Sequence, residues 1–371
     1  MPHDPYRALY LHLPFCVKRC AYCDFHTRAL PASDPRIDAY VEDLALQVRR
    51  KANEGELAHI ETVYLGGGTP SHVGLARLSS LLYMVSLSVD LAREGMEFTM
   101  EANPESMGER LVRDVWALGV NRLSLGVQSF DDEVLSLLGR AHTAADARAA
   151  LRAAHERFEN VSVDLMCGIP GQSSESFARS LDEAVSTGAV HVSVYPLTVE
   201  PGTPFFRAVT RGEMPEPDDD TAADHMQLAS RLLAEAGFSR YEVASYAKPG
   251  FESKHNSAYW TGVPYLGLGE SAATMTQNAQ RRMRVQDGQV VDDLDRAQYE
   301  TEDLMLGMRL ARGITDERLR AAAEHAPLLP DIFTGLVRNG LVVHEKGRWR
   351  PTEQGWLCGN ELYGRVLDAA P

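Results

Sequence analysis

Short apolar segments alternate with helical patterns through roughly the first two hundred residues, and this alternation restricts the fold more than any other feature. Helical stretches such as Pro35–Lys51, which opens with Asp34 as a cap and Pro35 at the first helical position, separate the segments. Strands that alternate with helices form parallel sheets. The sequence therefore predicts an α/β fold with a partial (β/α)6 TIM-like barrel, and a doubly wound open sheet is the alternative. The candidate strands are Ala8–Leu13, Ile60–Leu65, Glu97–Glu101, Asn121–Leu125, Val161–Met166 and Val190–Tyr195.

Unusual residues follow each predicted strand at its carboxyl end. The carboxyl ends of barrel strands build the functional site in α/β barrels. We therefore expect these residues to meet on one rim. They are a cysteine-rich loop after the first strand, Gly66–Pro70 after the second, Glu101, Gln128, Asp164 with Gly168–Gly171, and Thr198 after the sixth.

The cysteine-rich loop carries Cys16, Cys20 and Cys23 in a Cys-x-x-x-Cys-x-x-Cys spacing. A [4Fe-4S] cluster normally takes four cysteines, so three would leave one iron open to another ligand. Three unrelated thiols, or three ligands of a zinc site completed by a distant His or Cys, are the alternatives. The spacing resembles that of the radical SAM superfamily. The resemblance implies a [4Fe-4S] cluster whose open iron is chelated by the amino and carboxylate groups of S-adenosylmethionine.

Composition narrows the class of protein. The formal net charge of -15 argues against a nucleic-acid partner, because such binding depends on neutralising phosphates. Five cysteines, three of them clustered, do not suggest a disulfide framework, and Cys167 and Cys358 are by default small buried hydrophobes. We find neither a secretory signal pattern nor an apolar run long enough for a transmembrane segment. A cytoplasmic location is expected, and an oxygen-sensitive cluster needs that reducing environment.

The sequence pattern changes after the predicted barrel, which we assign to residues 1–215. A smaller α+β region follows. Residues 216–293 are expected to contain a linker helix at Thr221–Ala236, a strand at Phe238–Ala244 and a loop from His255 to Gly269. Residues 294–371 show three helices and then a hairpin at Gly340–His344 and Arg348–Arg350, which is typical of a winged helix. Because the chain is acidic, a structural or interaction module is favoured over DNA binding.

The segments Tyr10–Cys16, Gly66–Pro70 and Gly126–Phe130, with Asp164, are similar to those of oxygen-independent coproporphyrinogen III dehydrogenases and their relatives. Taken alone, the glycine run allows close backbone approach to a ligand but also fits a tight turn, and Glu101 suits ribose hydroxyls but also fits a solvated carboxylate. The resemblance implies S-adenosylmethionine contacts from Tyr10, Tyr22, Gly67, Gly68, Thr69, Glu101, Gln128, Arg140, Asp164, Thr198 and Ala273.

Two features depart from those dehydrogenases. The dehydrogenases carry a further cysteine where this chain has Phe25, and they have a longer segment before the first cysteine. Instead, this chain has His255-Asn256-Ser-Ala-Tyr259-Trp260, which resembles the HNxxYW signature of HemW-type haem chaperones. Histidine is a common haem-iron ligand, and aromatic rings pack against porphyrins. A loop-ordering His-Asn pair with two core aromatics is the alternative.

The resemblance implies a haem-binding protein that passes haem to an acceptor, which the sequence does not name, with cleavage of S-adenosylmethionine left open. Coproporphyrinogen III dehydrogenation, or radical chemistry on another substrate, is the alternative function. Arg281, Arg282 and Arg284 suit haem propionates, though such clusters are commonly solvated. Lys18 and Arg19 are candidates for tuning the cluster potential or docking a flavodoxin-like electron donor, or are ordinary surface charges. A homodimer is compatible with the family.

Overall fold

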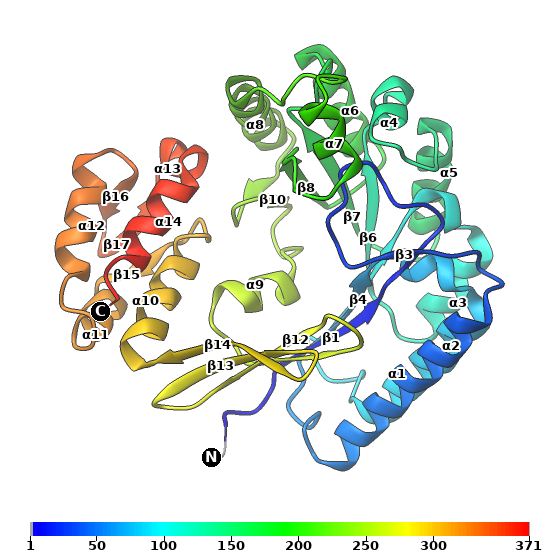
Figure 1. Cartoon of the computed structure of the whole chain (residues 1–371), viewed down its shortest axis with the longest axis horizontal. Coiled ribbons are helices and arrows are strands. Elements are labelled where there is room, and N and C mark those ends of the chain that lie inside the picture. Colours follow the sequence, from blue (N-terminus) through cyan, green and yellow to red (C-terminus); the bar gives the residue numbers. More distant parts are fainter. Residues whose placement is uncertain (1–2, 371) are drawn as a thin grey trace.

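The computed structural model describes residues 3–370, and its first half is a partial barrel of parallel strands. The six predicted strands are present, each hydrogen-bonded to the next in chain order, so the sheet does not reverse direction as a doubly wound sheet would. Figure 1 shows these strands surrounded by helices. They are β1 (Ala8–Leu13), β4 (Thr62–Gly67), β5 (Glu97–Ala102), β6 (Arg122–Gln128), β7 (Asn160–Cys167) and β8 (His191–Pro196).

Helices cover the outer face of the barrel, and the apolar core lies between these helices and the strands. On β5, for example, Phe98 and Met100 are buried in this core, while the alternate residues Glu97, Thr99 and Glu101 carry polar groups to the inner face. The barrel interior is therefore polar. The covering elements are α1 (Pro35–Asn53), α2 (Leu75–Ser88), α3 (Glu109–Ala117), α4 (Asp132–Leu137), α5 (Ala144–His155), α6 (Ser174–Ser186) and α8 (Asp219–Glu235), with α7 (Pro204–Thr210) and the short 3-10 turns Pro70–Val73 and Pro104–Ser106 at the rim.

The region after the barrel continues its sheet at both edges. β11 (Tyr265–Leu268) runs parallel to β1, and β12 (Ala273–Gln277), β13 (Arg281–Gln286) and β14 (Gln289–Asp295) extend that edge as antiparallel strands. At the other edge, β10 (Ser245–Ala247) pairs with β8 and with β9 (Ser239–Arg240). The single strand predicted at Phe238–Ala244 is wrong, because the chain turns back at Glu242, whose buried carboxylate accepts from the Ala244 N–H.

The loop predicted from His255 to Gly269 begins instead with a helix, α9 (Lys254–Trp260), before β11. Ser253 caps this helix by accepting from the Asn256 N–H. The buried carboxylate of Glu97 accepts from the N–H groups of Lys254 and His255, each at 2.9 Å. A negative charge at a helix N-terminus stabilises the first turn. Because Glu97 is distant in sequence, local patterns could not predict this cap.

The C-terminal part has its own apolar core, which includes Leu304, Phe333 and Leu362. Figure 1 shows it as a lobe beside the barrel, with α9 between the two. The predicted winged-helix order is present, and two helices follow it. None of the helices in residues 3–370 is long and apolar enough to cross a membrane. The elements are α10 (Arg296–Gly307), β15 (Ile314–Thr315), α11 (Asp316–Ala323), α12 (Leu329–Arg338), β16 (Val342–Glu345), β17 (Arg348–Pro351), α13 (Glu353–Leu357) and α14 (Gly359–Leu367).

The arginine cluster on β13 joins that strand to α10. Arg282 is fully buried, and its guanidinium pairs with Glu302 and Asp303, each at 2.5 Å. Arg284 pairs with Glu302 and Asp292, and Arg281 pairs with Asp293 near the surface. The structure therefore does not support the hypothesis that this cluster binds haem propionates, because all three guanidinium groups already have carboxylate partners.

Replacing Arg282 with Met is expected to lower the free energy of unfolding by about 3 kcal/mol, because it leaves two partly buried carboxylates with less compensation. The matched substitution Arg281→Ala removes an exposed pair and should cost less than about 1 kcal/mol. Urea unfolding of the two variants measures both values. Equal losses would show that Arg282 does not stabilise this junction.

Candidate functional site

The cysteine loop lies over the carboxyl ends of the barrel strands. Two short parallel strands, β2 (Phe15–Cys16) and β3 (Arg28–Ala29), pair at its base and fix where it begins and ends. The half-buried thiols of Cys16, Cys20 and Cys23 line a cavity of about 370 Å³. Burial raises the pKa of the Cys16 thiol to about 11.

The donor set fits a [4Fe-4S] cluster. Three thiols reach one cavity from a single loop, and the guanidinium of Arg140 lies 3.3 Å from the Cys20 sulfur, where it can offset thiolate charge. Within residues 3–370, no three His, Cys, Asp or Glu side chains are arranged to hold a single metal ion. A cubane is wider than one ion, so its thiolates lie further apart than the ligands of a single ion.

The glycine run after β4 forms a second wall of this cavity. Gly67 has φ +112°, and a Cβ there would lie 2.5 Å from the imidazole of His12, so only glycine fits. A Cβ on Gly68 would lie 2.7 Å from the Phe15 backbone nitrogen. The His12 imidazole is itself held by the hydroxyl of Tyr10 at 2.9 Å. The glycines therefore let the run pack closely against β1 and the start of the cysteine loop, and Gly67 and Gly68 line the cavity.

Two half-buried carboxyl groups, Glu101 and Asp164, line the cavity. Glu101 accepts from the Tyr64 hydroxyl at 2.7 Å and the Gly67 N–H at 3.1 Å. Burial raises the pKa of Glu101 to about 7, and the nearby Asp164 adds to the effect. Asp164 accepts from the Ser124 hydroxyl at 3.0 Å, and burial raises its pKa too. Such carboxyl groups can accept hydrogen bonds from hydroxyl or amino groups of a ligand.

The end of β6 carries local backbone strain. Gln128 has φ 66°, a left-handed conformation that is unusual for a residue other than glycine, and the register with β7 shifts between Gly126 and Gln128. Strained residues of this kind gather at ligand sites. The guanidinium of Arg140 fixes the bulge by donating to the Gly126 carbonyl at 2.6 Å.

Asn103 connects the cysteine loop to the strands, and it was not among the residues predicted from the sequence. Its amide nitrogen donates to the Thr69 hydroxyl at 2.9 Å, and its amide oxygen accepts from Arg140 at 2.8 Å. Thr69 in turn lies 3.5 Å from the Cys16 sulfur. The one available signal was its place after the third strand. Ser124 and Tyr195 line the same cavity and were missed as well.

The structure brings together eight of the side chains or glycines that the resemblance implied for S-adenosylmethionine. Tyr10, Thr198 and Ala273 do not line this cavity: Tyr10 supports it through His12, Thr198 lines a neighbouring cavity, and Ala273 lies on β12. Cys167 is fully buried in the barrel core, so it packs. The eight are Tyr22, Gly67, Gly68, Thr69, Glu101, Gln128, Arg140 and Asp164.

The neighbouring cavity, of about 1030 Å³, lies between the barrel rim, α9 and the C-terminal lobe. Asn256, Tyr259 and Trp260, spaced to share one face of α9, all line it. Tyr195 lines both this cavity and the cysteine cavity.

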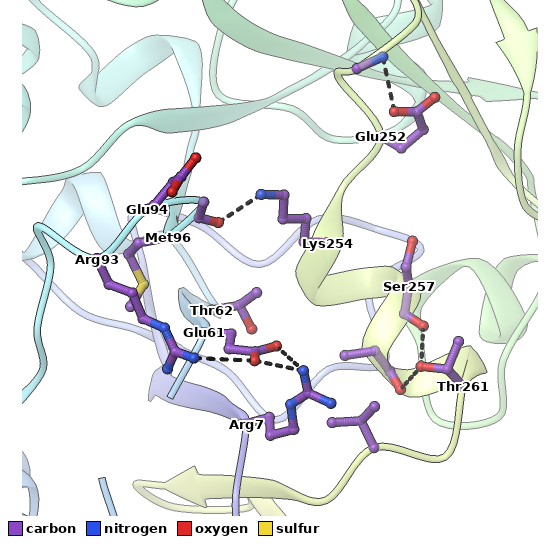
Figure 2. A pocket seen from close by; sticks show the side chains of 14 residues that line it. Arg7, Glu61, Thr62, Arg93, Glu94, Met96, Glu252, Lys254, Ser257 and Thr261 are labelled. Carbon is purple, nitrogen blue, oxygen red and sulfur yellow. Dashed lines mark hydrogen bonds and ion pairs between the residues drawn. The ribbon is translucent and has the colours of Figure 1, made fainter. Parts of the chain in front are cut away.

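The opposite face of α9 borders a third cavity at the amino ends of the strands (Figure 2). Most of the basic side chains that line it already have partners. Arg7 and Arg93 both pair with Glu61, and the Lys254 ammonium donates to the Gly95 carbonyl.

His255 faces the barrel interior, between those two faces of α9. It is 1% exposed, and its ring nitrogens contact the Thr62 hydroxyl at 2.9 Å and the Tyr259 hydroxyl at 3.2 Å. Its ring stacks on Tyr64, the residue that donates to Glu101. In this conformation neither nitrogen is available to a haem iron, which matches the loop-ordering alternative more closely than a ligand role.

Comparison with known proteins agrees with this geometry. The Radical SAM superfamily matches residues 10–184, and the HemN C-terminal domain matches residues 294–358. The chain is 39% identical to the haem chaperone HemW of Mycobacterium tuberculosis, over 99% of this chain and 96% of that protein. It is 31% identical to HemW of Bacillus subtilis, over 97% and 99% of the two chains. The chain belongs to the HemW family of radical SAM haem chaperones.

The fold of this HemW family member is that of a solved relative. Coproporphyrinogen III oxidase (HemN) from Escherichia coli matches with a TM-score of 0.80 at 21% identity, covering 98% of this chain and 90% of that one. This likeness shows the shared fold, including the partial barrel and the C-terminal lobe.

Asn103→Ala is expected to weaken S-adenosylmethionine binding to the anaerobically reconstituted protein about tenfold, because Arg140 and Thr69 lose a shared partner. Equilibrium dialysis measures the affinity, and the iron content reports the cluster. Asn339→Ala, on the exposed end of α12, is the matched control. An unchanged affinity in Asn103→Ala would contradict the bracing role.

His255→Gln tests the buried state of the imidazole. Burial lowers the pKa of His255 to about 3, from an ordinary value near 6.5, with a smaller contribution from Arg122. The imidazole therefore binds a proton less readily in the folded protein than in the unfolded chain. Its contribution to the free energy of unfolding is complete above about pH 6.5. Below that pH the contribution falls on acidification, by at most about 1.4 kcal/mol per pH unit.

The free-energy difference between wild type and His255→Gln should accordingly shrink from about pH 7.5 to about pH 5 in urea unfolding series. The exposed His325→Gln should follow wild type throughout. A wild-type advantage over His255→Gln that does not change with pH would mean that the imidazole is not buried in its neutral form.

Proposed function

We propose that this protein is a haem chaperone that binds haem, a [4Fe-4S] cluster and S-adenosylmethionine, and that passes haem to an acceptor protein. The observation that carries the proposal is the position of the HNxxYW residues. Asn256, Tyr259 and Trp260 line a large cavity that adjoins the cysteine cavity at Tyr195. The relatives named HemW, similar over nearly the whole chain, support the same function.

In this proposal Cys16, Cys20 and Cys23 hold the cluster, which when bound supplies a redox-active iron with one open position. Glu101 and Asp164 would accept hydrogen bonds from the nucleotide, the Gly67–Thr69 backbone would bind its methionine end, and Arg140 would balance thiolate charge. Tyr22 and Gln128 complete this lining. The resemblance also implied Tyr10, Thr198 and Ala273. These three residues would influence the nucleotide site from around the cavity without lining it.

Asn256, Tyr259 and Trp260 would contact haem directly, and His255 would contribute by holding α9. His255 would reach an iron only if its hydrogen bonds to Thr62 and Tyr259 broke and α9 moved. Tyr259 and Trp260 offer flat apolar surfaces of the kind that pack against a porphyrin.

Further partners follow from exposed features of the same rim. Lys18 and Arg19 are exposed and border the cysteine cavity, which supports docking of an acidic, flavodoxin-like electron donor. A cytoplasmic location and a homodimer remain predictions.

An anaerobic haemin titration of the reconstituted protein, followed by Soret absorbance, tests the proposal. Wild type should bind haemin saturably at one site, and Trp260→Leu should weaken binding about tenfold because a packing face is lost. Trp116→Leu, an exposed tryptophan on α3, is the matched control. His255→Ala should weaken binding as well, because α9 loses its anchor.

Absence of haemin binding in wild type would overturn the proposal. A second outcome would also overturn it. Incubation with coproporphyrinogen III, a reductant and S-adenosylmethionine is expected to leave the substrate unchanged, because exposed Phe25 stands where the dehydrogenases carry a cysteine. Formation of protoporphyrinogen would instead establish the dehydrogenase activity.

A further inference from the structure

The cavity beside α9 is built by two parts of the chain that fold around separate apolar cores. The barrel side contributes the rim after β8, the turn after β9 and one face of α9. The C-terminal lobe contributes Arg309 after α10, Trp356 and Leu357 of α13, and Asn360 of α14. Its volume of about 1030 Å³ is at the upper end of the roughly 300–1,000 Å³ typical of small-molecule sites.

Two arginines lining this cavity have no carboxylate partner. Among residues 3–370, neither Arg240 nor Arg309 forms an ion pair. Arg240 donates only to the backbone carbonyls of Glu242 and Val243, and the buried Nε of Arg309 has no hydrogen-bond partner within the described chain. The chain has 52 acidic residues against 37 basic ones, so two partly buried arginines without carboxylates are unexpected.

Each guanidinium stacks on a tryptophan across the boundary between barrel and lobe. Arg240, from the barrel side, lies 4.4 Å from the ring centroid of Trp356 in the lobe. Arg309, from the lobe, lies 5.0 Å from the ring centroid of Trp260 on α9 and 4.4 Å from that of Tyr363 in the lobe itself. Stacking orients the planar forks while leaving donor groups at their edges free for an anion.

Within residues 3–370, the acidic residues that line the cavity form no ion pair with Arg240 or Arg309, although Glu242 lies near enough to Arg240 to interact with it electrostatically. The Glu242 carboxylate accepts from the Trp260 indole at 3.1 Å and the Ala244 N–H at 3.2 Å. Glu216, on the linker, and Asp219, at the start of α8, also line the cavity and are exposed. The interior therefore offers two guanidinium groups and several aromatic surfaces. These are the groups that recognise a flat, largely apolar dicarboxylate.

We propose that this cavity is the haem site, with the two haem propionates bound by Arg240 and Arg309 and the macrocycle packed against Tyr259, Trp260 and Trp356. The assignment rests on the proposed haem-chaperone function and replaces the arginines of β13 as propionate partners. Bound there, haem contacts barrel and lobe together, and Tyr195 separates it from the cysteine cavity.

Anaerobic haemin titration of Arg240→Gln, Arg309→Gln and the double variant tests the assignment, beside haem dimethyl ester, which lacks propionate charges. Each single change should weaken haemin binding about tenfold and the double change about a hundredfold. Wild type should bind the ester about as weakly as the double variant binds haemin. The substitutions should leave the affinity for the ester unchanged. Arg281→Gln with Arg284→Gln is the matched control, expected to bind haemin as wild type does.

A second variant keeps the test independent of the arginine–tryptophan stacking. Asn360→Trp adds bulk to the cavity from an exposed position on α14 and should weaken binding of both ligands at least tenfold. Haemin binding by wild type that persists unchanged in the double variant and in Asn360→Trp would overturn this site while leaving the haem function intact. A wild type that binds no haemin would overturn the function itself.

Discussion

The carboxylate of Glu97 at the start of β5 is the constraint on which the two cavities depend. It is 5% exposed, and it accepts from the first N–H groups of α9 inside the barrel. A buried carboxylate that loses such donors is strongly destabilised, so the helix is bound to that strand. Because α9 lies there, one of its faces points to the barrel interior and another to the large cavity.

The same strand carries Glu101 four residues further on, at the cysteine cavity. Between them runs a continuous set of contacts: the Tyr259 hydroxyl to His255, the His255 ring on Tyr64, and the Tyr64 hydroxyl to Glu101. Glu101 then accepts from the Gly67 N–H in the glycine run. The buried histidine of the HNxxYW motif is thus one element of the support beneath the cysteine cavity, which explains its place in the motif without assigning it to iron.

Sequence patterns predicted the features that depend on residues close together in the chain. The six barrel strands followed from apolar segments between helices, and Gly67 and Glu101 from their places at strand ends. The helix α9 was missed because its cap, Glu97, is distant in sequence, and Asn103 because nothing local distinguishes a bracing amide from a polar loop residue. The arginines of β13 were misread since charge density along a sequence does not show that Glu302 and Asp303 face them.

In the proposed haem site, the arrangement of charge would require the C-terminal lobe. Arg240 and Arg309 come from different parts of the chain, and each is oriented by a tryptophan of the other part. Any dianionic ligand that engages both guanidinium groups favours the state in which barrel and lobe are apposed. Tyr195 lines both cavities. Linkage is reciprocal, so if occupancy of the cysteine cavity changes the affinity of the large cavity, occupancy of the large cavity changes the affinity of the cysteine cavity by the same factor. In the proposed haem carrier, this shared tyrosine would be the contact through which the cluster site and the haem site influence each other.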